Sequence, residues 1–113
     1  MHGRAKGYIG EQLAAEYLEA KGLRIIARNK KFAGVEVDIL ALGGNTLVLC
    51  EVKTAEQANA HPSMWVSREQ QRRYVRAATS LLMRRAYSGC NVRFDVIEVC
   101  AGSVRVIEGA FEA

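Results

Sequence analysis

Four charged residues interrupt two otherwise apolar segments of the chain, residues 35–42 and 47–54. These residues are Glu36, Asp38, Glu51 and Lys53. Paired carboxylates bind hard divalent cations through their oxygens, and an ammonium group beside them can contact a phosphate or a water molecule. Such a set of groups is typical of metal-assisted hydrolysis, provided that the fold brings the two segments together.

A hairpin would bring them together, because the segments flank Gly43-Gly44-Asn45-Thr46 and Gly-Asn is a frequent turn between strands. If the two middle residues form the centre of the turn, Asp38 lies opposite Glu51 and Glu36 lies opposite Lys53. These residues then share a face with four leucines, and the other face is entirely apolar. A turn centred one residue earlier would place Glu36 opposite Glu51, and a three-residue turn would break the registration.

In the favoured register the Cβ atoms of Asp38 and Glu51 are ~5 Å apart, and like charges directly opposite each other destabilise a sheet. Partly buried carboxylates must be protonated, paired or bridged by a cation, and Mg²⁺ with oxygen ligands would resolve the conflict. Lys53 points to the same side as Glu51. The alternative is an exposed strand end, where Lys53 forms a surface ion pair worth only ~0–1 kcal/mol with Glu36 or Glu51.

A long helix is predicted from Ser67, which forms a capping box with Gln70, to about Ala86. Its polar side carries a cluster of four arginines: Arg68, Arg72, Arg73 and Arg76. This cluster is either a phosphate-contacting stripe or a solvated helix face. Gln71 falls in the middle of the apolar face instead, so its amide either meets solvent at the helix end or projects towards the carboxylates.

The other segments complete a mixed α/β (α+β) pattern. Residues 9–21 predict a helix that Gly22 stops, with Gly10 on its apolar stripe, where a neighbour can approach closely, and Glu11 on the shoulder of that stripe. Strands are predicted over residues 23–28, 92–99 and 103–108, the first followed by the basic connector Asn29-Lys30-Lys31, whereas residues 54–65 have no clear periodicity. The order α-β-β-β-α-β-β favours a mixed sheet with two helices.

Length and composition set the broad class of the protein. The chain has 113 residues, half of them hydrophobic and a quarter charged, which suits one globular domain. No apolar run approaches the ~18 residues that span a bilayer, the first residues lack a signal-peptide core, and the three cysteines form no C-x-x-C pair. We therefore expect a cytoplasmic protein without a membrane partner. Its net charge of +4 is compatible with a polyanionic partner.

Five stretches of the chain carry a family resemblance. They are GYIGEQLAAEYLEAKGLRIIARN, EVDILAL, LVLCEVKT, SREQQRRYVRAATSLL and VRFDVIEV. In this order they resemble the YraN-type uncharacterised bacterial family, which is similar to the Holliday-junction-resolvase branch of the PD-(D/E)xK nucleases. The chain departs from the family pattern at Val35, where a small residue is usual, and at Ala55-Glu56-Gln57, where arginine often follows.

The resemblance implies a single nuclease-like domain over residues 1–113, with a restriction-endonuclease-like α-β-β-β-α-β core. By position, Asp38 matches the aspartate of the family motif, Glu51 and Lys53 match its E-x-K, Glu11 matches an acidic residue of the first helix, and Gln71 falls in the second-helix motif. The implied activity is Mg²⁺-dependent (or Mn²⁺-dependent) cleavage of structured or branched DNA by a homodimer.

In that function the metal would be held by Asp38, Glu51, the Val52 carbonyl and Glu11. Lys53 would orient the attacking water. The DNA backbone would lie on the arginine cluster and on Lys30 and Lys31. The alternative is a catalytically silent nucleic-acid-binding or adaptor module on the same fold, and a third reading is a protein-interaction domain with a structural acidic cluster.

Overall fold

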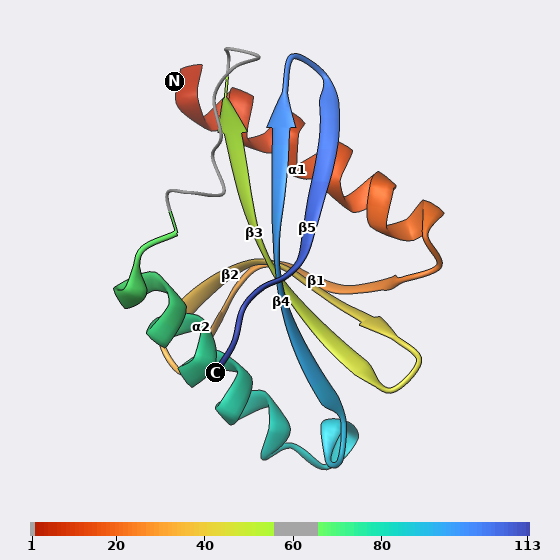
Figure 1. Cartoon of the computed structure of the whole chain (residues 1–113), viewed down its shortest axis with the longest axis vertical. Coiled ribbons are helices and arrows are strands. Elements are labelled where there is room, and N and C mark those ends of the chain that lie inside the picture. The colour runs from red at the N-terminus through yellow and green to blue at the C-terminus, as the bar shows by residue number, and fades with distance from the viewer. Residues whose placement is uncertain (1, 56–65) are drawn as a thin grey trace.

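Within the described residues, 2–55 and 66–113, two α-helices and a five-stranded sheet follow one another in the predicted order (Figure 1). The structure is a computed structural model. Its elements are α1 (His2–Ala20), β1 (Arg24–Phe32), β2 (Val35–Gly43), β3 (Thr46–Ala55), α2 (Arg68–Leu82), the short 3-10 helix η2 (Arg85–Tyr87), β4 (Asn91–Cys100) and β5 (Ser103–Phe111). The expectation of a mixed sheet with two helices is confirmed.

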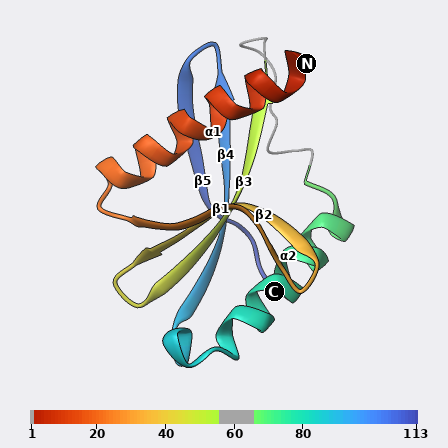
Figure 2. The ribbon, with the colours of Figure 1, turned by 180° about the vertical axis from the view of Figure 1, so that it is seen from behind.

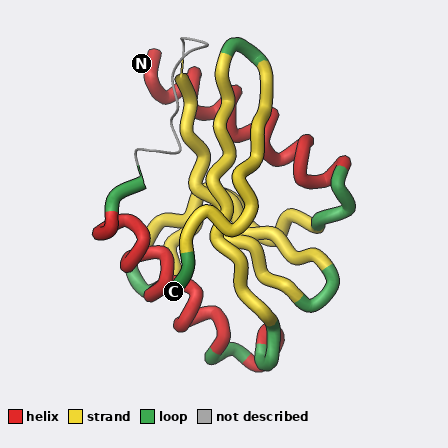
Figure 3. The backbone as a smooth tube through the Cα atoms, in the orientation of Figure 1, coloured by secondary structure: helices red, strands yellow, loops and turns green. Residues whose placement is uncertain are grey.

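The strands lie in the sheet in their sequence order, β1-β2-β3-β4-β5. Neighbours are antiparallel except β3 and β4, which are parallel and are joined through α2. A parallel pair needs such a crossover, whereas the antiparallel pairs need only tight turns. The strands cross near the middle of the molecule, where the sheet twists strongly (Figure 3).

The two helices cover opposite faces of the sheet. α1 passes behind β3, β4 and β5 in Figure 1 and in front of them in Figure 2. The α1 side buries Ala14, Leu18, Ile39, Val48 and Ile97, and the α2 side buries Leu40, Leu47, Leu49, Tyr74 and Leu81. From Ile39 onward in β2, and from Leu47 to Cys50 in β3, consecutive residues alternate between the two cores as the two-residue repeat of a strand requires. Burying each leucine contributes about 1.5–3 kcal/mol.

The hairpin between β2 and β3 has the favoured register. Its pairs run from Gly43–Thr46 at the turn to Ile39–Cys50, and Gly44 has a φ of 59° in the two-residue turn. That φ lies in the left-handed region, which glycine enters without a Cβ clash. The two alternative turns considered from the sequence are therefore excluded.

The predicted bounds of the N-terminal elements were partly wrong. α1 begins at His2 and not at the predicted Ile9, which is 61% exposed. β1 continues to Phe32, so Lys30 and Lys31 lie in a strand and not in a connector. β1 is an edge strand, and an edge tolerates a run of polar residues that resembles a loop in sequence.

The predicted bounds of the C-terminal elements also shift. Ser67 caps α2, its Oγ accepting from the N–H of Gln70 at 3.1 Å, which is the serine half of the predicted capping box, whereas the side-chain amide of Gln70 donates to Glu51. The helix ends at Leu82 and not near Ala86. β5 extends to Phe111, beyond its predicted end. Most of the long predicted loop lies outside the described residues. No helix in the described part of the chain is long and apolar enough to cross a membrane.

Candidate active site

The ladder between β2 and β3 stops beside Asp38, and a tyrosine occupies the position where it stops. Tyr74 of α2 is fully buried, and its hydroxyl donates to the Cys50 carbonyl at 3.2 Å and accepts from the Asp38 N–H at 3.3 Å. Val37 packs in the α2-side core with Leu40, so the alternation of β2 breaks at Asp38. Through Tyr74, α2 therefore determines where the pairing of β2 with β3 ends and where the side chain of Asp38 is placed.

Asp38 and Glu51 lie close together at this point, although the described ladder ends at Ile39–Cys50 and does not include the predicted cross-strand pair Asp38–Glu51. Asp38 Oδ2 accepts from the N–H of Val52 at 2.8 Å, and Glu51 is only 8% exposed. Both carboxylates line a pocket of about 260 Å³. Burial, followed by the nearby charge of Glu51, raises the pKa of Asp38 to about 8, and the hydrogen bond from the Val52 N–H opposes this rise with a smaller effect.

A glutamine from α2 reaches Glu51, but it is Gln70 and not Gln71. The amide of Gln70 donates to Glu51 Oε2, whereas the amide of Gln71 donates to the Val66 carbonyl at 3.3 Å. The reading that projects Gln71 towards the carboxylates is therefore wrong. The buried positions of α2 include Ala77, which lies two turns after Gln70 on the same side of the helix. The buried face of α2 is therefore centred nearer to Gln70 than the sequence predicted.

Lys53 lies beside the pair without forming a close contact. Its Nζ is 3.9 Å from Glu51 Oε1, and its side chain is 24% exposed. The predicted antiparallel pairing with Glu36 is absent from the described ladder, where Glu36 pairs with Lys31 of β1 and its side chain lines the carboxylate pocket. The ammonium group of Lys53 therefore lies next to Glu51, at the edge of the carboxylate pair.

Glu11 connects α1 to β1. It is 7% exposed, and its Oε1 accepts from Arg28 Nε at 3.0 Å and from Asn29 Nδ2 at 2.7 Å. Its charge contributes to the raised pKa of Asp38, after the larger effects of burial and Glu51. Glu11 is thus near the pair but is engaged with β1. The predicted close approach at Gly10 is confirmed, because a Cβ there would lie 2.6 Å from Thr54 Oγ1 of β3.

The predicted phosphate-binding residues occupy different surfaces. Arg73 lines the pocket of Asp38 and Glu51. Arg68, Arg72 and Arg76 line a separate hollow on the other flank of α2. Lys30 and Lys31 are exposed on the edge strand β1.

The donor atoms around Asp38 suit a hard divalent cation. Two carboxylates face one pocket, and the N–H of Val52 points to Asp38. Because the N–H and C=O of a residue in an extended strand face the same neighbour, the Val52 carbonyl lies on that side too. Oxygen donors of this kind are the ligands that Mg²⁺ prefers. Among the described residues, no group of three or more His, Cys, Asp or Glu side chains is placed to hold a metal ion.

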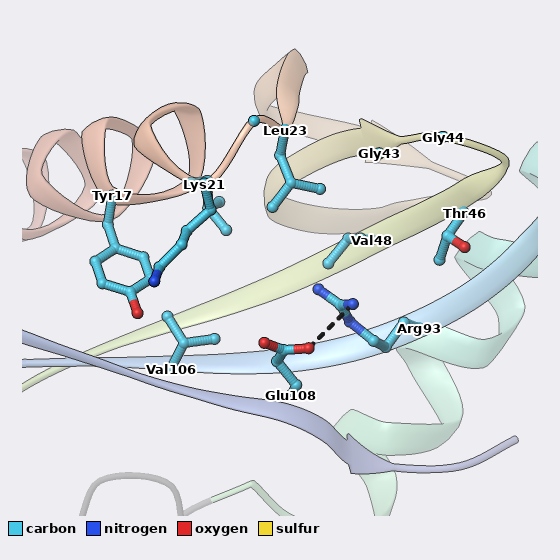
Figure 4. A pocket seen from close by; sticks show the side chains of 12 residues that line it. Tyr17, Lys21, Leu23, Gly43, Gly44, Thr46, Val48, Arg93, Val106 and Glu108 are labelled. Atoms are coloured by element: carbon cyan, nitrogen blue, oxygen red, sulfur yellow. Dashed lines mark ion pairs between the residues drawn. The ribbon is translucent and has the colours of Figure 1, made fainter.

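A second pocket, of about 500 Å³, lies on the α1 side of the sheet near the β2–β3 turn (Figure 4). Its lining includes Lys21, Arg93 and Glu108. Arg93 is committed to two carboxylates, at 2.9 Å from Asp95 and 3.2 Å from Glu108. Asp95 also accepts from the N–H of Gly109 of β5. These contacts hold β4 and β5 together. Because Arg93 is already paired with two carboxylates, the pocket of Asp38 and Glu51 is the better candidate for an active site.

The fold and the site define an α+β protein with a mixed sheet, two helices and a semi-buried acidic pair beside a basic helix. Residues 10–99 match the family described as "Uncharacterised protein family UPF0102". A UPF0102 protein of Symbiobacterium thermophilum is 42% identical over 116 residues, covering 97% of this chain and 98% of the relative. One of Geobacter sulfurreducens is 42% identical over 117 residues, covering 98% and 91%. The chain belongs to the UPF0102 family, as the YraN-type resemblance indicates.

Proposed function

We propose that this protein is a divalent-cation-dependent nuclease that hydrolyses phosphodiester bonds in structured or branched DNA. The observation that carries the proposal is the Asp38–Glu51 pair, two carboxylates that share a small pocket with Arg73. A like-charge pair costs stability unless a proton or a cation neutralises it. The resemblance of the chain to PD-(D/E)xK nucleases, whose motif these residues match, supports the same reading.

The residues at and beside the pocket have separate roles in this proposal. Asp38, Glu51 and the Val52 carbonyl would hold Mg²⁺ or Mn²⁺. When bound, such an ion lowers the pKa of water and neutralises phosphate charge. Gln70 holds the Glu51 carboxylate in one orientation through its amide. Lys53 orients the attacking water or stabilises charge on the phosphate, because its ammonium is close to Glu51 but not tightly paired.

The remaining basic residues would hold the DNA backbone. Arg73 is placed to contact the phosphate at the pocket, and the other arginines of α2 are exposed for neighbouring phosphates. Lys30 and Lys31 extend the basic surface along β1. Contacts of this kind give salt-sensitive binding with little sequence selectivity. By analogy with the resolvases, a homodimer acting in the cytoplasm would present two such sites to a junction.

A catalytically silent nucleic-acid-binding module is the second candidate. The observation that favours it is the separation of Arg68, Arg72 and Arg76 from the carboxylate pocket. Binding through these residues needs no metal ion. The two candidates therefore differ in whether Asp38 matters for the interaction with DNA.

A cleavage assay separates the two candidates. Four-way, forked, single-stranded and duplex DNA are incubated with the protein in Mg²⁺, in Mn²⁺ and in EDTA. Asp38→Asn and Lys53→Ala should each lose on the order of 100-fold in rate. Glu19→Gln, an exposed acid at the far end of α1, serves as the matched control and should keep the wild-type rate.

Equal cleavage by the wild type, Asp38→Asn and Lys53→Ala would refute the site assignment. DNA binding by the wild type without cleavage of any substrate would favour the adaptor.

A further inference from the structure

Two hollows adjoin one another on the flank of α2 that faces away from the carboxylates. One, of about 710 Å³, lies beside Arg68, Arg72 and Arg76, and the other, of about 430 Å³, lies between α2 and the ends of β4 and β5. Val75 and Glu112 line both of them. We call the two hollows together the α2–β5 groove. Figure 1 shows the C-terminal end of the chain running down beside α2 at this place.

The floor of the α2–β5 groove is apolar and includes an aromatic ring. Phe111 is half-buried and stacks on Phe94, with 4.9 Å between the ring centroids and 13° between the ring planes. Tyr74 meets Phe111 edge-on at 6.4 Å. Val75 and Leu82 of α2 are partly buried against the same core. Phe111 is therefore held rigidly from two sides while part of its surface remains open to the groove.

The rim of the groove is cationic. Arg68, Arg72 and Arg76 are exposed and recur every four residues, so they form one row along α2. Successive members are ~6 Å apart along the helix axis, from a rise of about 1.5 Å per residue. This distance is comparable with the spacing of neighbouring phosphates on one nucleic-acid strand.

We propose that the α2–β5 groove binds an unpaired nucleic-acid strand, with its phosphates on the arginine row and its bases on the apolar floor. The proposal deepens the proposed function by naming the kind of strand that the protein holds next to its site, and it rests on that function. The bases of a duplex are stacked inside the helix and cannot reach an apolar floor. Unpaired bases can stack on aromatic side chains, whereas a row of arginines alone would not discriminate between the two forms.

The groove and the carboxylate pocket lie on the two flanks of the same helical turn. Gln70 and Arg73 line the pocket, whereas Gln71 and Arg72 line the groove. A strand that crosses the first turn of α2 would therefore lead from the groove to Asp38 and Glu51. The preferred substrate would then carry unpaired nucleotides next to the bond that is cut, as a fork, a flap or an open branch point does.

Binding measured without metal ions tests the groove separately from catalysis. Fluorescein-labelled oligothymidylate of about 12 nucleotides is titrated with the full chain in EDTA, and anisotropy reports the affinity. Arg72→Gln/Arg76→Gln should weaken binding roughly fivefold or more, and Arg24→Gln/Arg85→Gln, which removes equal charge elsewhere, should change it less than about twofold. Glu112→Gln should strengthen binding roughly twofold, because it removes an acid from the groove.

Photocross-linking locates the bases. An oligonucleotide that carries 5-iodouracil should cross-link to the segment of β5 that contains Phe111, and Phe111→Leu should reduce the yield without loss of folding, as judged by thermal unfolding. Duplex DNA that binds as tightly as the single strand, equal weakening by the two double variants, or cross-links confined to other segments would overturn the proposal. If any of these results accompanies cation-dependent cleavage that needs Asp38, the groove fails while the proposed function stands.

Discussion

Asp38 should make the folded protein less stable as the pH rises. Folding moves the pKa of its carboxyl from 3.8 to about 8, because the group is buried beside Glu51. Between these values the folded chain holds a proton that the unfolded chain has released, so the stabilisation is complete below pH 4 and is lost as the pH rises through 8. The loss is up to about 1.4 kcal/mol per pH unit, which gives an upper limit of ~6 kcal/mol over the window.

Asp38→Asn is the perturbation that isolates this effect. Its amide oxygen can still accept from the N–H of Val52, and its amide nitrogen can donate to Glu51, as a protonated carboxyl would. The variant should match the wild type near pH 4 and should be the more stable of the two at pH 9. Urea unfolding of both proteins from pH 4 to pH 9 measures the difference, in which the titration of groups away from the Asp38–Glu51 pair cancels.

A divalent cation should take the place of the proton. At pH 9, Mn²⁺ at 100 times its dissociation constant should stabilise the wild type by about 2.7 kcal/mol and should leave Asp38→Asn nearly unchanged. That gain corresponds to roughly 10 °C in the unfolding midpoint of a domain of this size. Parallel pH profiles for the two proteins, or equal stabilisation of both by Mn²⁺, would refute the reasoning.

Three further predictions concern the surroundings of the pair. Tyr74→Phe removes a hydroxyl that bonds backbone groups of both β2 and β3, so the free energy of unfolding should fall by ~1–3 kcal/mol in urea, and an unchanged value would contradict this role. Gln70→Ala should reduce cation-dependent cleavage by roughly tenfold and Gln71→Ala by much less, and equal losses would speak against the contact with Glu51. Gly10→Ala should lower the unfolding midpoint, although alanine is the better helix former, and Thr54→Ala in the same chain should restore it; a midpoint raised by Gly10→Ala alone would count against close packing.

The hairpin was predictable because local rules determine it. The Gly-Asn turn fixes the register as far as Ile39–Cys50, and this register brings Asp38 and Glu51 to the same end of the ladder from positions thirteen residues apart. The same two-residue alternation also predicted that the charged residues share one face at the ends of β2 and β3. What the register could not show is that the ladder stops at Asp38, because that depends on the hydroxyl of Tyr74 from a distant helix.

The contact of Glu51 with Gln70, where Gln71 was the predicted candidate, depends on how α2 lies on the sheet. Helical periodicity locates an apolar face to within about one residue, and each residue rotates the face by about 100°. The structure buries Ala77 and leaves Val75 and Leu82 partly exposed, which turns Gln70 towards Glu51. A helical wheel drawn from the sequence does not show which side of the helix packs against β2.

Mn²⁺ binding to the free protein is the most direct test of the cation site. Calorimetric titration at pH 8 of the wild type, Asp38→Asn, Glu51→Gln and the control Glu19→Gln compares proteins that differ by one charge each. We predict one ion per chain for the wild type and the control, and a loss of at least about tenfold in affinity for the two pocket variants. Unchanged affinity in Asp38→Asn and Glu51→Gln would contradict the assignment of this pair as a metal site.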